Sequence, residues 1–408
     1  MALIKPFCAY RPRKDIVSAV AALPYDVYNR EEAKEVVAKN PLSFLRIDRA
    51  ETQFDDSIST YDPCVYNKAK ELLNDMISKG QYVLENKKAF YVYELTMDGR
   101  TQTGIVGCAS IDDYMNNVIK KHENTREEKE IDRINHVDIC DAQTGPIFLA
   151  YRAQKQIDDL IEVVKKQDPE YSFYSEDGIK HQVYVITDED KINILSDAFS
   201  KMNEIYIADG HHRAASAVKV GIKRRNEKNE IGLESDFFLS VLFPDNQLKI
   251  LPYNRVVSDL NGHTEEEFFE LVSEKFNIIK CDDKVSPSEK FTYGMFVNEQ
   301  WYMLTAKNDI RVDDPVEGLD VSILQNNLLN PILGIKDPRT DKRIDFVGGI
   351  RGLAELEKRT REDMKIAFSM YPTSIKELFD VADAGMLMPP KSTWFEPKLR
   401  SGIFIHKL

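Results

Sequence analysis

The chain has 408 residues, of which 42% are hydrophobic and 30% are charged. These values are those of an ordinary globular protein and suggest two or three domains. The formal net charge of −13 argues against a general nucleic-acid binder, which needs a basic surface. It still permits a small anionic ligand, because a local group of basic residues can override the overall sign.

The apolar runs and the cysteines bear on localisation. The N-terminal residues lack the apolar stretch of a signal peptide, and the longest apolar runs, such as 237–243, are too short to span a bilayer. The five cysteines are scattered, odd in number and without a C-x-x-C pair, which indicates reduced thiols rather than a disulfide framework or a zinc site. We therefore expect a cytoplasmic protein with no membrane partner.

Residues 1–104 are expected to form an N-terminal α/β segment. Its clearest signal is Asp98-Gly99, a pair typical of tight hairpin turns, which lies between two strand-like runs. The elements predicted for this segment are helices at 30–39 and 62–79, a strand at 43–48, and hairpin strands at 89–97 and 101–109.

Residues 105–256 are expected to form the core of the chain, and residues 257–408 a C-terminal α/β domain. The elements predicted for the core are strands at 147–151, 182–186, 205–208 and 237–243, and helices at 156–167, 188–202 and 213–220. Those predicted for the C-terminal domain are helices at 264–276 and 321–329, and strands at 293–297, 301–305 and 343–347.

The segment Ile205–Ala217 carries the most chemistry. Asp209-Gly210 ends an apolar run, and His211-His212 and Arg213 then lead into a helix of small residues. A helix N-terminus offers free N–H groups and a partial positive charge, so it is a natural anion site. Arg213 can bind a phosphate or carboxylate, and Asp209 can hold a metal ion or a hydroxyl. The alternative is a structural Asp-Gly turn with surface histidines.

Two further stretches are unusually rich in polar groups. Residues 120–133 are densely charged and include His122-Glu123, and the default interpretation is a solvated helix face with i,i+4 pairs. In the tail, residues 388–398 hold Lys391-Ser392-Thr393 between prolines, where their donors suit the oxygens of an anion. An edge strand with flanking prolines is the alternative for the tail.

Three of these motifs stand in a characteristic order. His122-Glu123 precedes a helix, Gly145-Pro146-Ile147 starts a strand, and Asp209-Gly210-His211-His212-Arg213 forms the turn. In this order they resemble the ParB/sulfiredoxin-like superfamily and, within it, the free-serine kinases. Glu123 and Asp209 are 86 residues apart (209 − 123), which is longer than the resemblance implies, so residues near 155–200 would be an insertion.

Over its full length the chain resembles the family called "domain of unknown function 1015". Its landmarks are Pro24-Tyr25-Asp26-Val27, the stretch from His122 to Arg133, the turn Asp209–Arg213 and the tail Met388–Lys398. The resemblance implies a mixed α/β (α+β) fold. In that fold a ParB/sulfiredoxin-like core at 105–256 carries additional N- and C-terminal α/β segments.

The resemblance to free-serine kinases implies a phosphotransferase of serine metabolism. Such an enzyme makes O-phospho-L-serine from free L-serine with ATP or ADP and Mg²⁺. Glu123 would accept the hydroxyl proton, and Asp209 would bind Mg²⁺ or orient the hydroxyl. The remaining roles would fall to His211 and His212 for charge on the phosphoryl group, to Gly210, Arg213 and His122 for the nucleotide or phosphate, and to Lys391, Ser392 and Thr393 for the substrate.

Other activities fit the same turn. A ParB-like nucleotide-binding regulatory protein would use this core without turnover, although no helix-turn-helix candidate accompanies it. A phosphoserine hydrolase would use the same site in the other direction. A sulfiredoxin-like reductase would need a cysteine where His211-His212 stands, and adjacent histidines rarely point at one metal ion. The expected partners are a nucleotide and serine or a similar small molecule, with no nucleic acid. The sequence leaves the oligomeric state undecided.

Overall fold

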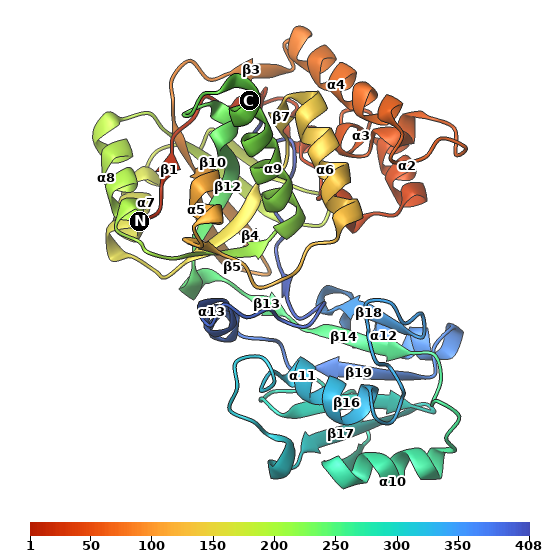
Figure 1. Cartoon of the computed structure of the whole chain (residues 1–408). Helices are drawn as coiled ribbons and strands as arrows, with labels where there is room; N and C mark the ends of the chain where they lie inside the picture. The colour runs from red at the N-terminus through yellow and green to blue at the C-terminus, as the bar shows by residue number, and fades with distance from the viewer. The chain divides into compact units, whose positions relative to one another are not determined.

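The computed structural model describes residues 1–408, and the chain folds into two compact units. One unit comprises Met1–Leu248 and Pro397–Leu408, and the other comprises Lys249–Glu396 (Figure 1). The second unit is therefore inserted into the first. The domain boundaries expected from the sequence differ from these. The expected boundary after residue 104 falls inside strand β5 (Arg100–Ser110), which pairs within the sheet of the expected core.

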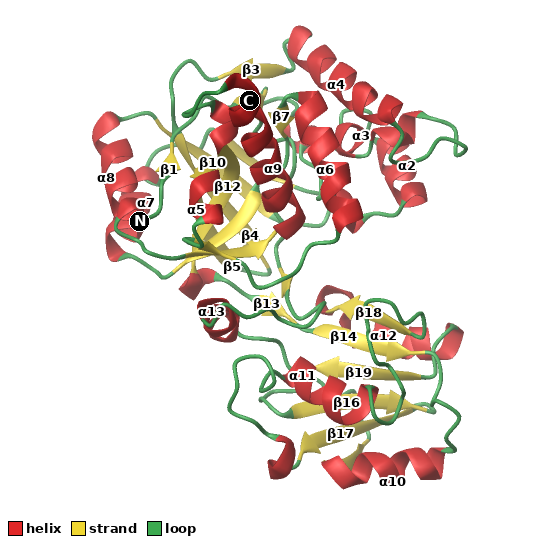
Figure 2. Ribbon diagram, in the orientation of Figure 1, coloured by secondary structure: helices red, strands yellow, loops and turns green.

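The first unit is built on a mixed nine-stranded sheet (Figure 2). Its strands lie in the order β6–β11–β8–β12–β5–β4–β10–β9, and β1 pairs with β5. The pairs β6–β11 and β8–β12 are parallel, and the other pairs are antiparallel. The remaining strands are β1 (Ile4–Lys5), β4 (Phe90–Met97), β6 (Ile119–Lys120), β8 (Ile147–Tyr151), β9 (Tyr171–Tyr174), β10 (Lys180–Ile186), β11 (Ile205–Asp209) and β12 (Phe237–Pro244).

Helices cover this sheet and extend away from it. Apolar residues of α7, α8 and α9 share one core with the strands, and α6 packs between α9 and α4. Helices α1 to α4 enclose a second core that also takes in Ile405 from the end of the chain. The helices are α1 (Val17–Val20), α2 (Arg30–Lys39), α3 (Leu45–Asp48), α4 (Pro63–Ser78), α5 (Ile111–Met115), α6 (Glu127–Cys140), α7 (Lys155–Val164), α8 (Glu189–Ser200) and α9 (His211–Lys228).

The last residues of the chain return to the first unit. Strand β21 (His406–Lys407) pairs with β7 (Ala142–Gln143), and Tyr82 donates a 2.6 Å hydrogen bond to the carbonyl oxygen of Gly402. Strand β2 (Tyr10–Pro12) pairs with β3 (Tyr82–Leu84) in the same region. The segment 397–408 is therefore an integral part of this unit.

The second unit is a six-stranded antiparallel sheet with helices. The strand order is β15–β17–β16–β19–β14–β18, and Leu356 of α12 lies in the apolar cluster on this sheet. A separate short pair joins β13 to β20. The elements are β13 (Ile250–Leu251), β14 (Tyr253–Val257), α10 (Glu265–Lys275), β15 (Phe276–Cys281), β16 (Thr292–Val297), β17 (Gln300–Ala306), α11 (Asp320–Leu324), β18 (Ile344–Gly348), α12 (Gly352–Glu362), β19 (Ile366–Met370), α13 (Ile375–Asp383) and β20 (Trp394–Phe395). No helix of either unit is both long enough and apolar enough to cross a membrane.

The mixed α/β class is confirmed, and most predicted elements lie within a few residues of those observed. The strand predicted at 43–48 is wrong, because α3 occupies it. Phe44, Leu45, Ile47 and Asp48 are all buried, and this spacing of buried side chains follows a helical period rather than alternation.

The helix predicted at 213–220 is longer than the sequence suggested. Helix α9 runs from His211 to Lys228 and ends at Asn229, which takes the left-handed conformation of a C-cap. Gly221 lies inside the helix, and a Cβ atom there would come within 2.3 Å of the backbone oxygen of Ser235. This glycine therefore permits close packing between α9 and residues 234–236 instead of ending the helix.

We expect Gly221→Ala to lower the free energy of unfolding by about 1–3 kcal/mol, the usual cost of overpacking, although alanine favours a helix. Urea denaturation measures this change. The matched control is Asn226→Ala, an exposed position of the same helix, whose effect should stay within about 0.5 kcal/mol. An equal stability of the two variants would contradict the close-packing role of Gly221.

Candidate active site

The candidate site lies where β11 passes into α9. Gly210 joins the two elements at φ 94°, in the left-handed region that suits glycine. The Oδ1 atom of Asp209 accepts the Gly210 N–H at 2.9 Å. A Cβ at residue 210 would lie 3.1 Å from the guanidinium of Arg213, so the arginine folds closely over the turn.

Helix α9 begins at this turn with no capping side chain. The N–H of Ala214 makes the first intrahelical bond, to the oxygen of Gly210 at 2.9 Å. The amides of residues 211–213 therefore stand at the positive end of the helix dipole, where an anion is bound most readily. The helix start lies where the sequence predicted it, and anion binding there stays a prediction.

The second carboxylate oxygen of Asp209 is paired with a lysine. The Nζ atom of Lys398 lies 3.1 Å from Oδ2 of Asp209. Burial raises the pKa of Asp209, but the positive charges of Lys398 and Arg213 outweigh burial and hold the pKa well below its ordinary value. Asp209 is thus an anion that already has a fixed cation, and Mg²⁺ binding by this residue stays a prediction.

The structure brings His122-Glu123 to the turn. The Oε2 atom of Glu123 lies 3.8 Å from Nδ1 of His211, and the rings of His122 and His211 meet edge to face with centroids 4.4 Å apart. Burial lowers the pKa of His122 to about 4, although the charge of Asp209 opposes the shift. Burial and the ring of His122 likewise lower the pKa of His211. Both histidines are therefore neutral near pH 7.

The next two residues of the turn contact other elements. Nε2 of His212 accepts the backbone N–H of Arg126 at 3.0 Å, which fixes the start of α6. The guanidinium of Arg213 donates a 2.5 Å hydrogen bond to the carbonyl oxygen of Pro146. Gly145-Pro146 is therefore in direct contact with the arginine, and both other motifs expected to share the site contact the turn.

A hollow of about 470 Å³, open in part to solvent, lies beside Arg213. Arg133 and Tyr25 also line it, and the Arg133 guanidinium lies 4.0 Å from the centre of the Tyr25 ring. The hydroxyls of Thr144 and Ser401 also line it, and so does the carboxylate of Asp48, which accepts the Thr144 hydroxyl at 2.9 Å. The guanidinium groups of its two arginines can bind an anionic group.

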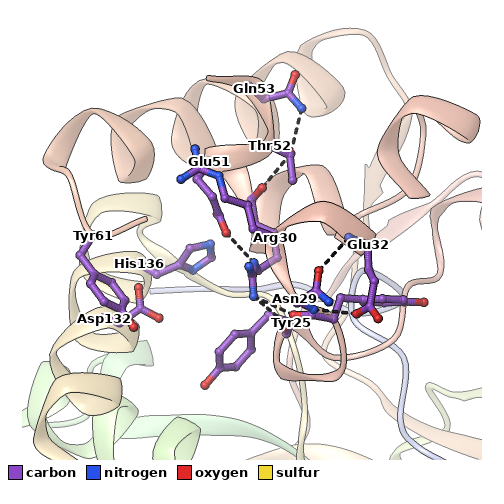
Figure 3. A network of polar contacts seen from close by, with 12 residues as sticks. Tyr25, Asn29, Arg30, Glu32, Glu51, Thr52, Gln53, Tyr61, Asp132 and His136 are labelled. Carbon is purple, nitrogen blue, oxygen red and sulfur yellow. Dashed lines mark hydrogen bonds and ion pairs between the residues drawn. The ribbon is translucent and has the colours of Figure 1, made fainter. Parts of the chain in front are cut away.

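A second hollow continues from the first on the side of the N-terminal helices. Tyr25 and His136 line both, and Asp132 lines only the second. Figure 3 shows these three residues, with Asp132 and His136 on α6. The interpretation of residues 120–133 as a solvated face is therefore wrong for half of the helix, since Glu130, Asp132 and Arg133 are buried.

The predicted substrate residues Lys391, Ser392 and Thr393 belong to the second unit. The Oγ atom of Ser392 donates to the carbonyl oxygen of Pro389 at 2.6 Å, and Nζ of Lys391 lies 5.4 Å from the centre of the Tyr253 ring. Their role in substrate binding stays a prediction. The tail residue that does reach the turn is Lys398 of the first unit.

The family comparison covers the landmarks before residue 322 and leaves the tail Met388–Lys398 outside the match. The family model described as "Protein of unknown function (DUF1015)" matches residues 4–322. The chain belongs to this family. No curated protein matches the sequence.

Solved structures with some likeness to this DUF1015 chain include nucleotide complexes. A free serine kinase mutant in complex with ADP is 11% identical with a TM-score of 0.35, and the match covers 74% of this chain and 93% of that one. A conserved hypothetical protein from Pyrococcus furiosus is 13% identical with a TM-score of 0.35, covering 74% and 94%. SbnI with a C-terminal truncation from Staphylococcus aureus is 10% identical with a TM-score of 0.37, covering 72% and 85%. At these TM-scores the likeness carries no argument about activity.

Sequence reasoning did not single out two cations of the candidate site, Lys398 and Arg133. Both lie inside landmarks that the sequence analysis named, the tail and the charged stretch. Each is one of many lysines or arginines along the chain, and no local pattern separates it from the others. Only the fold identifies Lys398, by bringing it to the carboxylate of Asp209.

We expect Lys398→Met to destabilise the DUF1015 protein by about 1–3 kcal/mol at pH 7, because Asp209 loses a charged hydrogen bond. The lowered pKa of Asp209 means that this contribution is complete above pH of about 4, the unfolded value, and is lost as the pH falls toward the folded one. Urea titrations of both proteins should show their difference shrinking below pH 4. Lys166→Met, at an exposed lysine, is the control. A difference independent of pH would show that the pair does not set the stability.

Proposed function

We propose that this protein is a small-molecule phosphotransferase that makes O-phospho-L-serine from free L-serine and ATP or ADP. The proposal takes its substrate from the resemblance of the three motifs to free-serine kinases. The observation that carries it is the 3.8 Å approach of Glu123 to His211. This approach sets a carboxylate beside an uncapped helix start that also holds Arg213. A proton acceptor next to an anion site is what transfer of a phosphoryl group to a hydroxyl requires.

In this proposal the serine hydroxyl oxygen forms the new bond to the terminal phosphorus of the nucleotide. The bond between that phosphorus and its bridging oxygen breaks, so that ATP leaves as ADP, or ADP leaves as AMP. The hydroxyl proton passes to Glu123, whose side chain is 41% exposed and can meet a substrate. No covalent enzyme intermediate is needed, because phosphoryl transfer depends mainly on positioning and charge stabilisation.

The charge on the transferred group would be met by fixed cations and amides. Arg213 and the N–H groups of residues 211–213 stand at the helix start, and Lys398 holds Asp209 beside them. The histidines have lowered pKa values, so His211 and His212 would act as neutral hydrogen-bonding groups rather than as cations. Mg²⁺ would be expected to arrive on the nucleotide phosphates, as is usual for this ion.

The hollow lined by Arg133 and Arg213 suits the carboxylate of an amino acid. Arg133 comes from α6, which follows His122-Glu123, and Arg213 comes from α9, which follows Asp209-Gly210. A carboxylate bound there would keep a small hydroxy acid next to the turn. Binding of a carboxylate in this hollow favours a hydroxy amino acid over a neutral alcohol as the substrate.

The anion site is tested by nucleotide binding. We expect Arg213→Ala to weaken ADP binding by about 1.5–3 kcal/mol, the value of a charged hydrogen bond, in isothermal titration calorimetry. Lys228→Ala, at the exposed far end of the same helix, is the matched control and should bind as the wild type does. If the Arg213→Ala variant bound ADP as tightly as the wild type, the turn would have a structural role only.

The chemical step is tested at Glu123. Glu123→Gln keeps the shape of the side chain but removes the proton acceptor, so phosphoserine formation should fall about 10²–10⁴-fold while nucleotide binding is kept. Mass spectrometry of mixtures with Mg²⁺, nucleotide and L-serine measures the product. Glu128→Gln, an exposed position on the first turn of α6, is the control. A wild type that binds nucleotide but forms no phosphoserine would instead indicate a regulatory switch, and release of phosphate from phosphoserine would indicate a hydrolase.

A further inference from the structure

We propose that His122, Glu123 and His211 form a binding site for one divalent transition-metal ion of the Zn²⁺ type. Each residue offers one ligand atom, and these atoms all lie within 4.8 Å of one another. The two histidines are not neighbours in the sequence, so both rings can face one ion. The site is separate from Asp209, to which sequence reasoning assigned a metal, and an ion bound there would occupy Glu123, the proton acceptor of the proposed reaction.

The strongest sign of a ligand is an unsatisfied nitrogen. The side chain of His122 is buried, with 2% of its surface exposed, and its Nδ1 atom has no hydrogen-bond partner. The ring also makes a hydrogen bond to the backbone carbonyl of Ile207. A bond of one ring nitrogen to a backbone carbonyl fixes the ring and leaves the other nitrogen as an acceptor, as in most metal-binding histidines. A buried acceptor without a partner is costly, and an ion would satisfy it.

The other two ligands complete a common donor set. His211 is buried and stands edge-on to His122, and Glu123 is half-buried at the rim. Two imidazoles and one carboxylate, with a fourth position open, are the protein ligands of many zinc enzymes. Bonds of about 2.0–2.2 Å in a tetrahedral site place the ligand atoms about 3.4 Å apart. Binding therefore requires the ligand atoms to move closer together, and Glu123, whose side chain is 41% exposed, is the least buried of the three residues.

The ligand atoms also determine which class of metal ion the site prefers. Imidazole nitrogens suit Zn²⁺, Co²⁺ and Ni²⁺, whereas Mg²⁺ prefers an all-oxygen shell. Asp209 offers oxygen only, and both of its oxygens are bonded within the chain. The cluster is therefore expected to take a transition-metal ion in the presence of excess Mg²⁺.

Binding of the metal alone tests the site, without reference to phosphoserine formation. Chelator-treated protein is titrated with Zn²⁺ in the calorimeter in the presence of excess Mg²⁺, and Co²⁺ is used to follow the visible absorption of a low-coordinate site. We expect one tight equivalent per chain. His122→Ala and His211→Ala should weaken it more than about 100-fold, since even outer-shell partners account for about 10–100-fold.

The test also needs a control variant, a further ligand variant and a check that each variant folds. His212→Ala removes the adjacent histidine, which lies outside the cluster, and should bind as tightly as the wild type. Glu123→Gln changes a partly exposed side chain, so it should fold even where a buried histidine variant does not, and it should also lose affinity. Circular dichroism checks the fold of each variant. The proposal is overturned if the wild type binds no Zn²⁺, or if the tight equivalent survives in Glu123→Gln and in the folded histidine variants.

Discussion

The site depends on the ion pair between Asp209 and Lys398 at a left-handed glycine. The carboxylate accepts the Gly210 N–H with one oxygen and the Lys398 ammonium with the other. The turn therefore keeps its shape with no capping side chain on α9, and the amides of the helix start remain available. The lysine arrives from residue 398, so the turn is completed only by the last segment of the chain.

The return of this last segment is secured at several points along the first unit. Arg400 donates to Ser175 Oγ at 3.1 Å, the Tyr82 hydroxyl bonds Gly402, and His406 pairs with Glu234 at 3.1 Å. These contacts join residues that are separated by the whole of the second unit. The first unit is therefore formed by two parts of the chain, on either side of residues 249–396. The tail contributes to the core and to the candidate site at once.

Burial determines which basic side chains of the site carry a charge near pH 7. The histidines at positions 122 and 211 are neutral because burial lowers their pKa values, whereas Arg213 and Lys398 carry the positive charge. A chain with a net charge of −13 can thus hold an anion in one place. Burial thus keeps the imidazoles of His122 and His211 neutral, while neighbouring cations keep the carboxylate of Asp209 ionised near pH 7.

The sequence by itself determined those elements whose signals are local. Asp98-Gly99 forms the hairpin turn with positive φ at both residues, and Thr264 caps α10 through a capping box. The position of the turn 209–213 followed from a strand, a glycine and a helix in succession. These patterns act within a few residues, so they can be recognised without knowing the rest of the fold.

Only the tertiary structure decided which distant groups meet. Sequence patterns gave no sign that Gly221 packs against Ser235, that Arg133 is buried against Tyr25, or that Lys398 pairs with Asp209. They favoured a helix end, a solvated face and a substrate loop instead. Burial and long-range pairing depend on the position of whole elements, and a lysine or a glycine has the same local pattern wherever the fold places it.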